Sequence, residues 1–231
     1  MTATSNENVH QVMSFDDAVS ARRSVRGFKP DPVTPELLDH LFGLATKAPS
    51  NCNTQPWRAV VCGGQRRDQV RDRILQAVKN GEMSLDFPFD GKYDGVYKER
   101  QYDAAFRLYG AMDVAREDRA GRDAVFMRNY ELFDAPHVAF LFLPEWSGMR
   151  EACDLGMYAQ TLMLAMTAHG LASCPQTSLG FFCDLLRDEF DIDPSWKLMF
   201  GLSFGYPDHA HKANNCVTPR ADLSEVVAFY N

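Results

Sequence analysis

Apolar residues recur every three or four positions over several stretches of the chain, which is the spacing of the buried face of a helix. After Thr34-Pro35, the apolar positions at this spacing are Leu37, Leu38, Leu41, Phe42, Ala45 and Ala48. A Thr-Pro pair is a typical helix start, and a residue before proline disfavours helical backbone, so this helix should end before Pro49. Similar patterns predict helices at about residues 15–22, 65–80, 150–169 and 180–190, and helical spacing resumes near Lys98.

Shorter apolar runs predict strands at residues 57–62, 138–143, 172–174 and 198–205. The run from Val138 to Leu143 has no polar residue, which is typical of a strand buried on both faces. Because helical patterns separate the runs, we expect an α+β sandwich whose sheet is not a simple hairpin meander. No repeat or linker divides the sequence, so we predict one domain over residues 1–231, with a loose tail at 1–13 and an excursion at 81–135.

The composition excludes several classes of protein. With 45% hydrophobic and 24% charged residues, the chain is not of the disordered or low-complexity type. The 24 Lys and Arg against 31 Asp and Glu give a net charge of −7, so neither nucleic acid nor a membrane surface is an expected partner. The longest uncharged apolar stretch, residues 155–168, is shorter than the ~20 residues of a membrane span. Since the first residues also lack a secretory signal, we expect a cytoplasmic protein.

The sequence does not indicate a metal site. The six cysteines form no Cys-x-x-Cys pair and no zinc-type spacing, so we interpret them as reduced thiols, mostly in the core. His209 and His211 lie in a polar segment without a third ligand nearby. His137, directly before the apolar run, is interpreted as a structural histidine.

A cluster of basic residues follows the first predicted helix, in the segment Arg22-Arg23-Ser24-Val25-Arg26. If the backbone is extended there, Arg22, Ser24 and Arg26 lie on one face. Two guanidinium groups and a hydroxyl on one face are suited to phosphate oxygens. A solvated helix end, with arginines near the last helix carbonyl groups, would contain the same residues. Both interpretations fit this segment when it is taken alone.

A second polar motif lies between a predicted helix and a predicted strand, in the segment Ala48-Pro49-Ser50-Asn51-Cys52-Asn53-Thr54-Gln55-Pro56-Trp57. Its neutral amide and hydroxyl groups suit a planar heterocycle with carbonyl groups and ring nitrogens, such as a flavin. Ordinary turns are also rich in Asn and Ser. Turns do not explain why this motif follows the arginine segment by about 25 residues, and that combination favours a flavin site.

Together the two motifs resemble the FMN-dependent nitroreductase family. Later matches, in the family's order, are Gly170-Leu171-Ala172-Ser173-Cys174-Pro175-Gln176-Thr177-Ser178-Leu179-Gly180, then Gly201-Leu202-Ser203-Phe204-Gly205-Tyr206-Pro207, then Arg220. The resemblance spans about residues 15–225 and is weakest over 80–130. It implies a three-layer sandwich with a central mixed, mostly antiparallel sheet flanked by helices. It also implies an intertwined homodimer with one FMN at each of two interfacial sites.

The resemblance implies roles for individual residues. Those expected around the FMN phosphate and ribityl chain are Arg22, Arg23, Ser24, Arg26 and Arg220. Those expected to contact the flavin from the other subunit are Pro49, Ser50, Asn51 and Asn53. Those expected along the flavin ring are Pro175, Gln176, Thr177 and Ser178. Thr177 and Ser178 are the candidate donors to flavin N5, and no side chain is expected to act as catalytic acid, base or nucleophile.

The implied function is hydride transfer from NADH or NADPH, through flavin N5, to a nitroaromatic or related electron-poor acceptor by a ping-pong mechanism. A reductive dehalogenase, an enone or quinone reductase and a non-catalytic flavin-binding module are the alternatives. Candidate wall residues for a small aromatic substrate lie in the excursion, at Phe87, Phe89, Tyr93, Tyr97, Tyr102, Phe106 and Tyr109. Arg100 or Arg107 is a candidate partner for a substrate carboxylate. The spacing of Tyr102, Phe106 and Tyr109 is also typical of a buried helical stripe.

Overall fold

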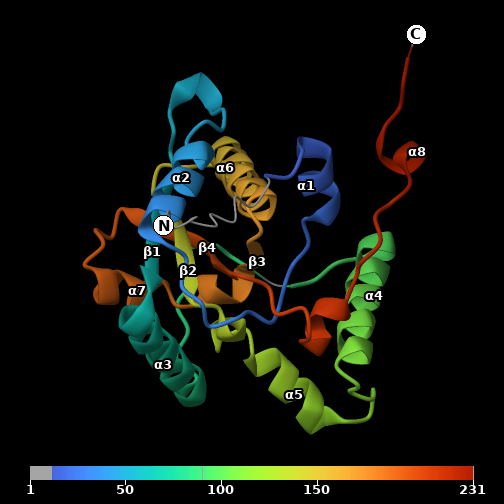
Figure 1. The fold of residues 1–231 in the computed structure, drawn as a ribbon. Helices are drawn as coiled ribbons and strands as arrows, with labels where there is room; N and C mark the ends of the chain where they lie inside the picture. The colour runs from blue at the N-terminus through green and yellow to red at the C-terminus, as the bar shows by residue number, and fades with distance from the viewer. Residues whose placement is uncertain (1–11, 90, 231) are drawn as a thin grey trace, which may run out of the picture.

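A four-stranded sheet in the order β1-β2-β4-β3 forms the centre of the computed structural model, which describes residues 12–89 and 91–230 (Figure 1). The strands are β1 (Arg58–Gly63), β2 (His137–Pro144), β3 (Ala172–Gln176) and β4 (Trp196–Gly205). All three strand pairings are antiparallel. Among the described residues, parallel pairing occurs as isolated bridges, one of which joins Ser24 to Ser173. The four described strands therefore form an antiparallel sheet that is not a simple meander, as predicted, and the parallel pairing that the resemblance implied is limited to these isolated bridges.

Helices cover both faces of the sheet. The α-helices are α1 (Phe15–Ala21), α2 (Pro35–Ala45), α3 (Gly64–Asn80), α4 (Gly95–Ala111), α5 (Arg119–Met127), α6 (Met149–Ala168), α7 (Cys183–Phe190) and α8 (Leu223–Val226). Short 3₁₀ turns are η1 (Asn51–Asn53), η2 (Leu132–Asp134), η3 (Thr177–Phe181) and η4 (Lys212–Asn215). Within the described ranges, none of the helices combines the length and the apolar character needed to cross a membrane.

Strand β2 belongs to two hydrophobic cores, because successive side chains of a strand point to opposite faces of the sheet. The side chains that pack with α2 and α6 are Ala139, Leu141 and Leu143. The side chains that pack with α3 and α7 are Val138, Phe140 and Phe142. All six are fully buried, which confirms the prediction of a strand buried on both faces. The result is a three-layer arrangement of helices, sheet and helices.

The predicted helices are present, with some ends displaced. Thr34 caps α2 by accepting a hydrogen bond from the Leu37 N–H (3.3 Å), as the Thr-Pro pair indicated. Helix α2 ends at Ala45, earlier than predicted, because the backbone tightens there: the Lys47 N–H donates to the Leu44 carbonyl and the Ala48 N–H to the Ala45 carbonyl (both 3.0 Å), which is 3₁₀-type bonding, ahead of Pro49. Helix α4 begins at Gly95 instead of near Lys98.

The N-terminal tail predicted at residues 1–13 lies mostly outside the described residues. At its end, the Met13 N–H donates to the Ala168 carbonyl (3.0 Å) in the last turn of α6. The backbone at Met13 is therefore attached to the end of α6.

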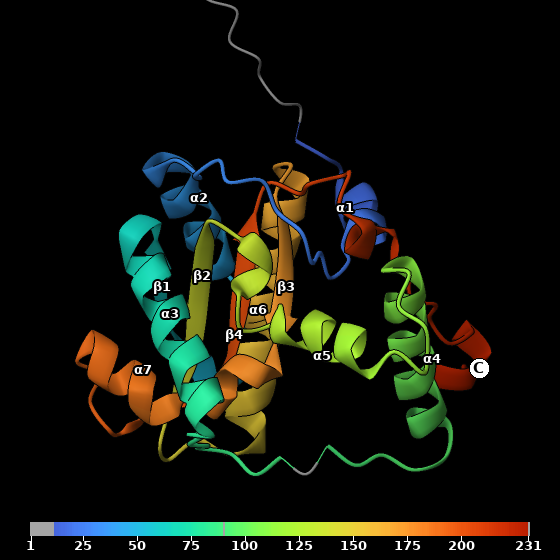
Figure 2. The same cartoon turned by 90° about the horizontal axis from the view of Figure 1, so that it is seen from below.

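The excursion at residues 81–135 leaves the sheet and carries α4 and α5, which stand apart from it in Figure 2. Helix α4 has no buried residue, and Tyr102 and Phe106 are 62% and 77% exposed. The interpretation of Tyr102, Phe106 and Tyr109 as a buried stripe is therefore wrong for the single chain. The physical reason is that no hydrophobic core of the described residues includes α4.

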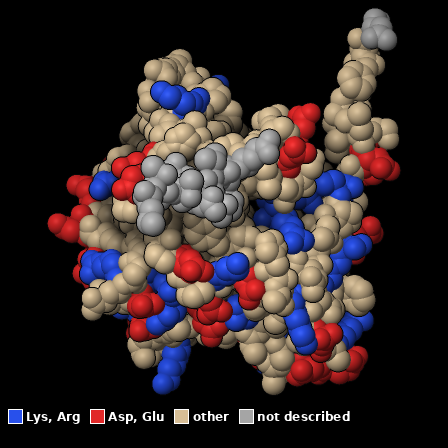
Figure 3. Space-filling model, viewed as in Figure 1, with Lys and Arg blue, Asp and Glu red and all other residues tan. Residues whose placement is uncertain are grey.

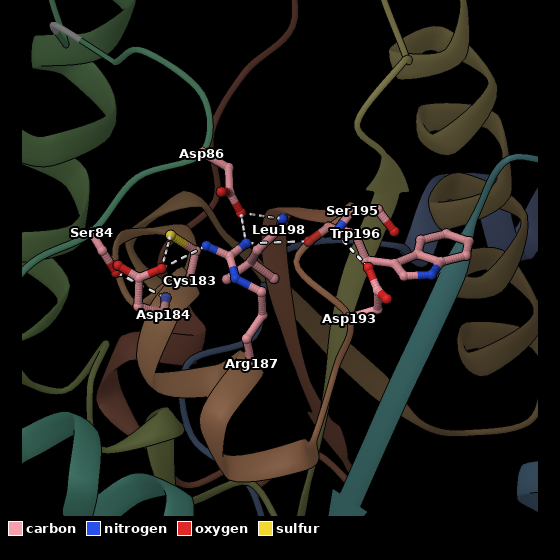
Figure 4. A network of polar contacts seen from close by, with 9 residues as sticks. All are labelled: Ser84, Asp86, Cys183, Asp184, Arg187, Asp193, Ser195, Trp196 and Leu198. Carbon is pink, nitrogen blue, oxygen red and sulfur yellow. Dashed lines mark hydrogen bonds and ion pairs between the residues drawn. The ribbon is translucent and has the colours of Figure 1, made fainter.

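A polar network fixes the start of the excursion to the body of the protein (Figure 4). The Asp86 carboxylate accepts hydrogen bonds from the Arg187 guanidinium on α7 (2.6 Å) and from the Leu198 N–H on β4 (2.7 Å). The Ser84 hydroxyl accepts a hydrogen bond from the Asp184 N–H (2.9 Å). The side chains of Asp86 and Arg187 are largely buried, so loss of either would leave the other charge unpaired away from water.

The close approach of η3 to β4 requires glycine at position 180. A Cβ atom there would lie 2.7 Å from the Met199 carbonyl oxygen, which is a backbone atom. We expect Gly180→Ala to lower the free energy of unfolding by about 1–3 kcal/mol, the usual cost of overpacking, as measured by urea denaturation. The control is Gly43→Ala on α2, whose Cβ would meet no heavy atom within 4 Å and which should be neutral or slightly stabilising. Equal losses at both positions would contradict this explanation.

Candidate functional site

The arginine segment lies in extended conformation beside β3. Ser24 bridges Ser173, and the Val25 N–H donates to the Ser173 carbonyl (3.1 Å). Val25 is buried, whereas its neighbours Ser24 and Arg26 are half-buried and line an open cleft. The backbone pairing with β3 therefore gives the common face that the sequence predicted for Arg22, Ser24 and Arg26, and Arg23 lines the same cleft.

The cleft has a volume of about 570 Å³ and is formed by α1, the arginine segment, α6 and the C-terminal segment. Its lining residues are Val19, Ser20, Ala21, Arg22, Arg23, Ser24, Arg26, Gln160, Cys216, Val217, Thr218 and Arg220. Four of these described lining residues are arginines, and none is acidic. Figure 3 shows basic side chains gathered between α1 and the C-terminal segment. This local charge is opposite in sign to the net charge of the chain, and it favours an anionic ligand.

Two arginines from opposite ends of the chain meet in this cleft. Burial and the positive charge of Arg220 both lower the pKa of the Arg22 guanidinium, although an arginine still stays protonated. The Arg220 guanidinium donates to neutral acceptors, which are the carbonyl and hydroxyl oxygens of Thr218 (both 3.1 Å) and the Pro219 carbonyl (3.0 Å). Since no acidic residue lines the described cleft, an anion there would be attracted by both guanidinium groups.

Asn214 joins the two parts of the chain that supply these arginines. Its side-chain oxygen accepts a hydrogen bond from the Arg26 N–H (2.8 Å), and its NH₂ group donates to the Gly27 and Asp208 carbonyls (both 2.8 Å). The residue is buried in η4, shortly before Arg220. Sequence reasoning missed Asn214, because its partners are distant in the chain and no local pattern signals such contacts.

Seven of the cleft's lining residues were not predicted as site residues from the sequence: Val19, Ser20, Ala21, Gln160, Cys216, Val217 and Thr218. For Gln160 a signal existed, because it is an amide within an otherwise mostly apolar and uncharged helical stretch. For Cys216 and Val217 the sequence carries no comparable signal.

The residues expected along the flavin ring, 175–178 (the ring segment), lie at the end of β3 and the start of η3, next to the arginine segment. Burial raises the pKa of Cys174 to about 11, and the nearby Arg26 charge and a hydrogen bond with Ser24 oppose this rise. The structure thus brings the start of the ring segment close to the arginine segment.

The four residues of the ring segment differ in what they can present to a ligand. The Gln176 side chain is used inside the fold, since it donates to the Asn129 carbonyl (2.7 Å) and accepts from the Ser203 hydroxyl. Pro175 and Thr177 are exposed. The Ser178 hydroxyl oxygen is buried and has no hydrogen-bond partner among the described residues. A ligand along this segment would therefore meet the backbone of Gln176 rather than its side chain.

The loop at residues 49–57 lies away from the arginine cleft of its own chain, and none of its residues lines that cleft. In Figure 1 the loop follows α2, whereas the arginine segment follows α1, and α6 lies between the two helices. Asn51 and Asn53 are exposed, while Ser50 is half-buried and accepts a hydrogen bond from the Gln55 N–H (2.9 Å). Cys52, Asn53 and Gln55 have positive φ angles (50°, 58° and 48°), a conformation that is unfavourable for residues other than glycine.

The remaining candidates have structural partners. The ring of His137 accepts a hydrogen bond from the Val33 N–H (2.9 Å) through Nε2, and burial lowers its pKa, which agrees with a structural histidine. Arg100 pairs with Glu225 (3.0 Å) and Arg107 with Asp103 (2.6 Å), so both guanidinium groups already have carboxylate partners. Within residues 12–89 and 91–230, no three or more His, Cys, Asp or Glu residues are grouped as metal ligands would be.

A comparison with models of protein families matches residues 19–206 to the Nitroreductase family. The chain belongs to the nitroreductase family. The matched region extends from α1 past the end of β4, and it includes the arginine segment, the loop at 49–57 and the ring segment. This confirms the resemblance on which the sequence interpretation depends.

Individual nitroreductases are similar over nearly the whole chain. Nitroreductase NfnB of Mycolicibacterium smegmatis is 41% identical over 229 residues, covering 99% of this chain and 97% of the relative. A 4-nitrobenzoate reductase of Pseudomonas putida is 34% identical over 214 residues, covering 89% and 91%. The crystal structure of the FMN-dependent nitroreductase NfnB from Mycobacterium smegmatis in complex with NADPH is similar with a TM-score of 0.90 and 42% identity, over 94% of this chain and 97% of that one. The fold is therefore the α+β nitroreductase fold.

The repulsion between Arg22 and Arg220 leads to a test on the purified nitroreductase. Without a bound anion, Arg220→Gln should raise the melting temperature, because it removes one of two neighbouring positive charges. Inorganic phosphate should stabilise the wild type, and it should stabilise the variant less than about half as much. Differential scanning fluorimetry in chloride and in phosphate, at equal ionic strength, measures both effects.

The control for this test is Arg119→Gln on α5. The Arg119 side chain is 88% exposed and lies outside the cleft. If phosphate stabilised wild type and Arg220→Gln equally, the anion site would not involve Arg220.

Proposed function

We propose that this nitroreductase is an FMN-dependent oxidoreductase that uses NADH or NADPH to reduce nitroaromatic compounds. The observation that carries the proposal is the cleft with four arginines and no acidic residue among its described lining residues, in a chain of this family. The similar NfnB structure from Mycobacterium smegmatis is FMN-dependent and contains NADPH. An FMN phosphate would offset the repulsion between Arg22 and Arg220, so the residues present fit that group.

The residues proposed to hold the FMN follow the shape of the site. Those at the phosphate and ribityl end are Arg22, Arg23, Ser24, Arg26 and Arg220. Those along the ring are Pro175, the backbone of Gln176, Thr177 and Ser178. The candidate donors to N5 are Thr177, which is exposed, and Ser178, whose hydroxyl has no hydrogen-bond partner among the described residues.

The site is proposed to be completed by a second copy of the chain. Pro49, Ser50, Asn51 and Asn53 lie outside their own arginine cleft, and the two Asn residues are exposed. Helix α4 also leaves large apolar side chains uncovered, including Phe106. Both features support a homodimer in which this loop contacts the flavin bound to the partner, with one FMN at each of two sites along the subunit interface.

The chain contributes binding and orientation, and little acid–base chemistry. When bound, FMN supplies the hydride-accepting and hydride-donating chemistry. The arginine cleft holds the anionic end, and the neutral amides and hydroxyls orient the ring. No Asp, Glu or His side chain is among the described lining residues of the cleft. As the family resemblance implies, we expect reductant and acceptor to use the same ring surface in turn, with ping-pong kinetics.

Nitroaromatic compounds are the proposed acceptors. Relatives of this chain are named 4-nitrobenzoate reductase and nitrobenzene nitroreductase. These names favour nitro reduction over reductive dehalogenation, enone or quinone reduction, or flavin binding without catalysis. Residues 81–135 are proposed to shape the substrate pocket as part of a single domain. A substrate carboxylate would have to compete with Glu225 for Arg100 and with Asp103 for Arg107. A cytoplasmic location, where reduced nicotinamide is available, is also proposed.

The phosphate assignment is tested by the double substitution Arg22→Ala with Arg26→Ala. Each charge-assisted hydrogen bond contributes about 1.5–3 kcal/mol, so loss of two should weaken FMN binding by roughly 10²–10⁴-fold. The variant should remain folded by circular dichroism and should purify colourless. The double substitution Arg116→Ala with Arg119→Ala, outside the cleft, should stay yellow. Full flavin occupancy in the Arg22/Arg26 variant would remove the phosphate assignment.

The enzymatic assignment is tested by anaerobic titration of the yellow protein. NADH or NADPH should bleach the flavin absorbance, and a nitroarene such as 4-nitrobenzoate should restore it. Steady-state rates at several fixed acceptor concentrations should give parallel double-reciprocal lines. A yellow protein that neither nicotinamide bleaches would support a binding module instead.

A further inference from the structure

A buried carboxylate outside the arginine cleft holds the loop at residues 49–57. Asp154, on α6, is 3% exposed. Both of its oxygens lie within hydrogen-bond distance of the Asn51 N–H, at 3.2 and 3.1 Å. Among the described residues, the carboxylate forms no further hydrogen bond and no ion pair. A single backbone N–H of a distant loop is therefore its partner.

A buried aspartate at position 154 lowers the stability of the fold, so its hydrogen bond to the loop is expected to serve a purpose. Burial of a carboxylate is unfavourable without a hydrogen-bond donor, and aspartate is not a favourable residue in a helix interior. Tyr158, four residues later and therefore on the same face of α6, is buried in the hydrophobic core, so Asp154 lies beside apolar surroundings. An apolar side chain at position 154 would suit both the helix and the core, but it could not accept a hydrogen bond from Asn51.

The loop requires such an anchor because its backbone is strained. Cys52, Asn53 and Gln55 all adopt positive φ angles, and such conformations persist only where surrounding contacts determine them. Helix α6 supplies contacts at both ends of the loop. Asp154 binds Asn51 at the start, and Tyr158, one turn later on the same helix, stacks on Trp57 at the end (ring centroids 5.1 Å apart).

We propose that Asp154 is a positioning residue for the flavin ring: it fixes the loop so that Asn51 and Asn53 meet the FMN bound to the partner. This inference rests on the proposed function. It goes further by naming the group that sets the geometry of a loop in which Asn51 and Asn53 are themselves exposed. Asp154 itself need not touch the cofactor, because it acts through the Asn51 backbone.

The test compares three substitutions in the purified holoenzyme. Asp154→Asn keeps an oxygen acceptor at the same place, whereas Asp154→Ala removes it and Asp154→Ser has a hydroxyl too short to reach Asn51. We expect the Ala and Ser variants to bind FMN about tenfold more weakly and to show altered visible circular dichroism of the bound flavin. The Asn variant should stay within about threefold of wild type and keep the wild-type spectrum. Fluorescence titration with FMN measures the affinity.

Thr167→Val is the control for a merely structural effect. Thr167 is also buried on α6, and its hydroxyl donates to the Met163 carbonyl (2.9 Å) within the helix instead of to the loop. This variant should lower the melting temperature but leave the flavin spectrum and FMN affinity unchanged.

Two outcomes would overturn the role of Asp154. One is a folded Ala or Ser variant with wild-type FMN affinity and flavin spectrum. The other is a folded Asn variant that binds FMN about tenfold more weakly than wild type, which would show that the charge of Asp154 matters and not its hydrogen bond. This outcome is measured against wild type, so it can be read even if the Ala and Ser variants fail to fold. A wild-type protein that binds no FMN would instead refute the proposed function, so the two failures are distinguishable.

Discussion

The burial of β2 on both faces is the constraint on which the rest of the structure depends. A strand without polar side chains requires apolar cover on each side, and α2 with α6 and α3 with α7 supply it. Strand β4 then pairs with β2, and β3 becomes an edge of the sheet. The arginine segment pairs with that edge through Ser24 and Ser173. The position of the charged cleft is thus a consequence of how the core is packed.

The cleft holds like charges close together, which is unfavourable until an anion binds. Arg22 follows α1 and Arg220 lies near the end of the chain, and the buried Asn214 ties their segments together. The stability of the packed sheet and helices offsets this repulsion. Because the guanidinium groups are already in place before a ligand arrives, binding requires less ordering of side chains.

Helix α6 connects the two parts of the proposed flavin site. Within about two turns it presents Asp154 and Tyr158 to the loop at 49–57 and Gln160 to the arginine cleft. The loop and the cleft of one chain do not meet, and no residue of α4 is buried. A second copy of the chain would bring a loop to each cleft, and it would also cover the exposed apolar side chains of α4.

The sequence by itself determined the strands, most of the helices though not α5 or α8, the two-sided burial of residues 138–143, and the family, because each depends on local periodicity or on short contiguous motifs. It also singled out Arg22, Ser24 and Arg26 as one face, since extended backbone alternates its side chains. Only the tertiary structure decided that Arg22 meets Arg220, that Asn214 binds Arg26 and that Asp154 binds Asn51. It also decided that Tyr102 and Phe106 are exposed, although their spacing suits a buried stripe equally well. The physical reason is that periodicity shows which face of an element is apolar, whereas its partner depends on how distant elements pack around the shared core.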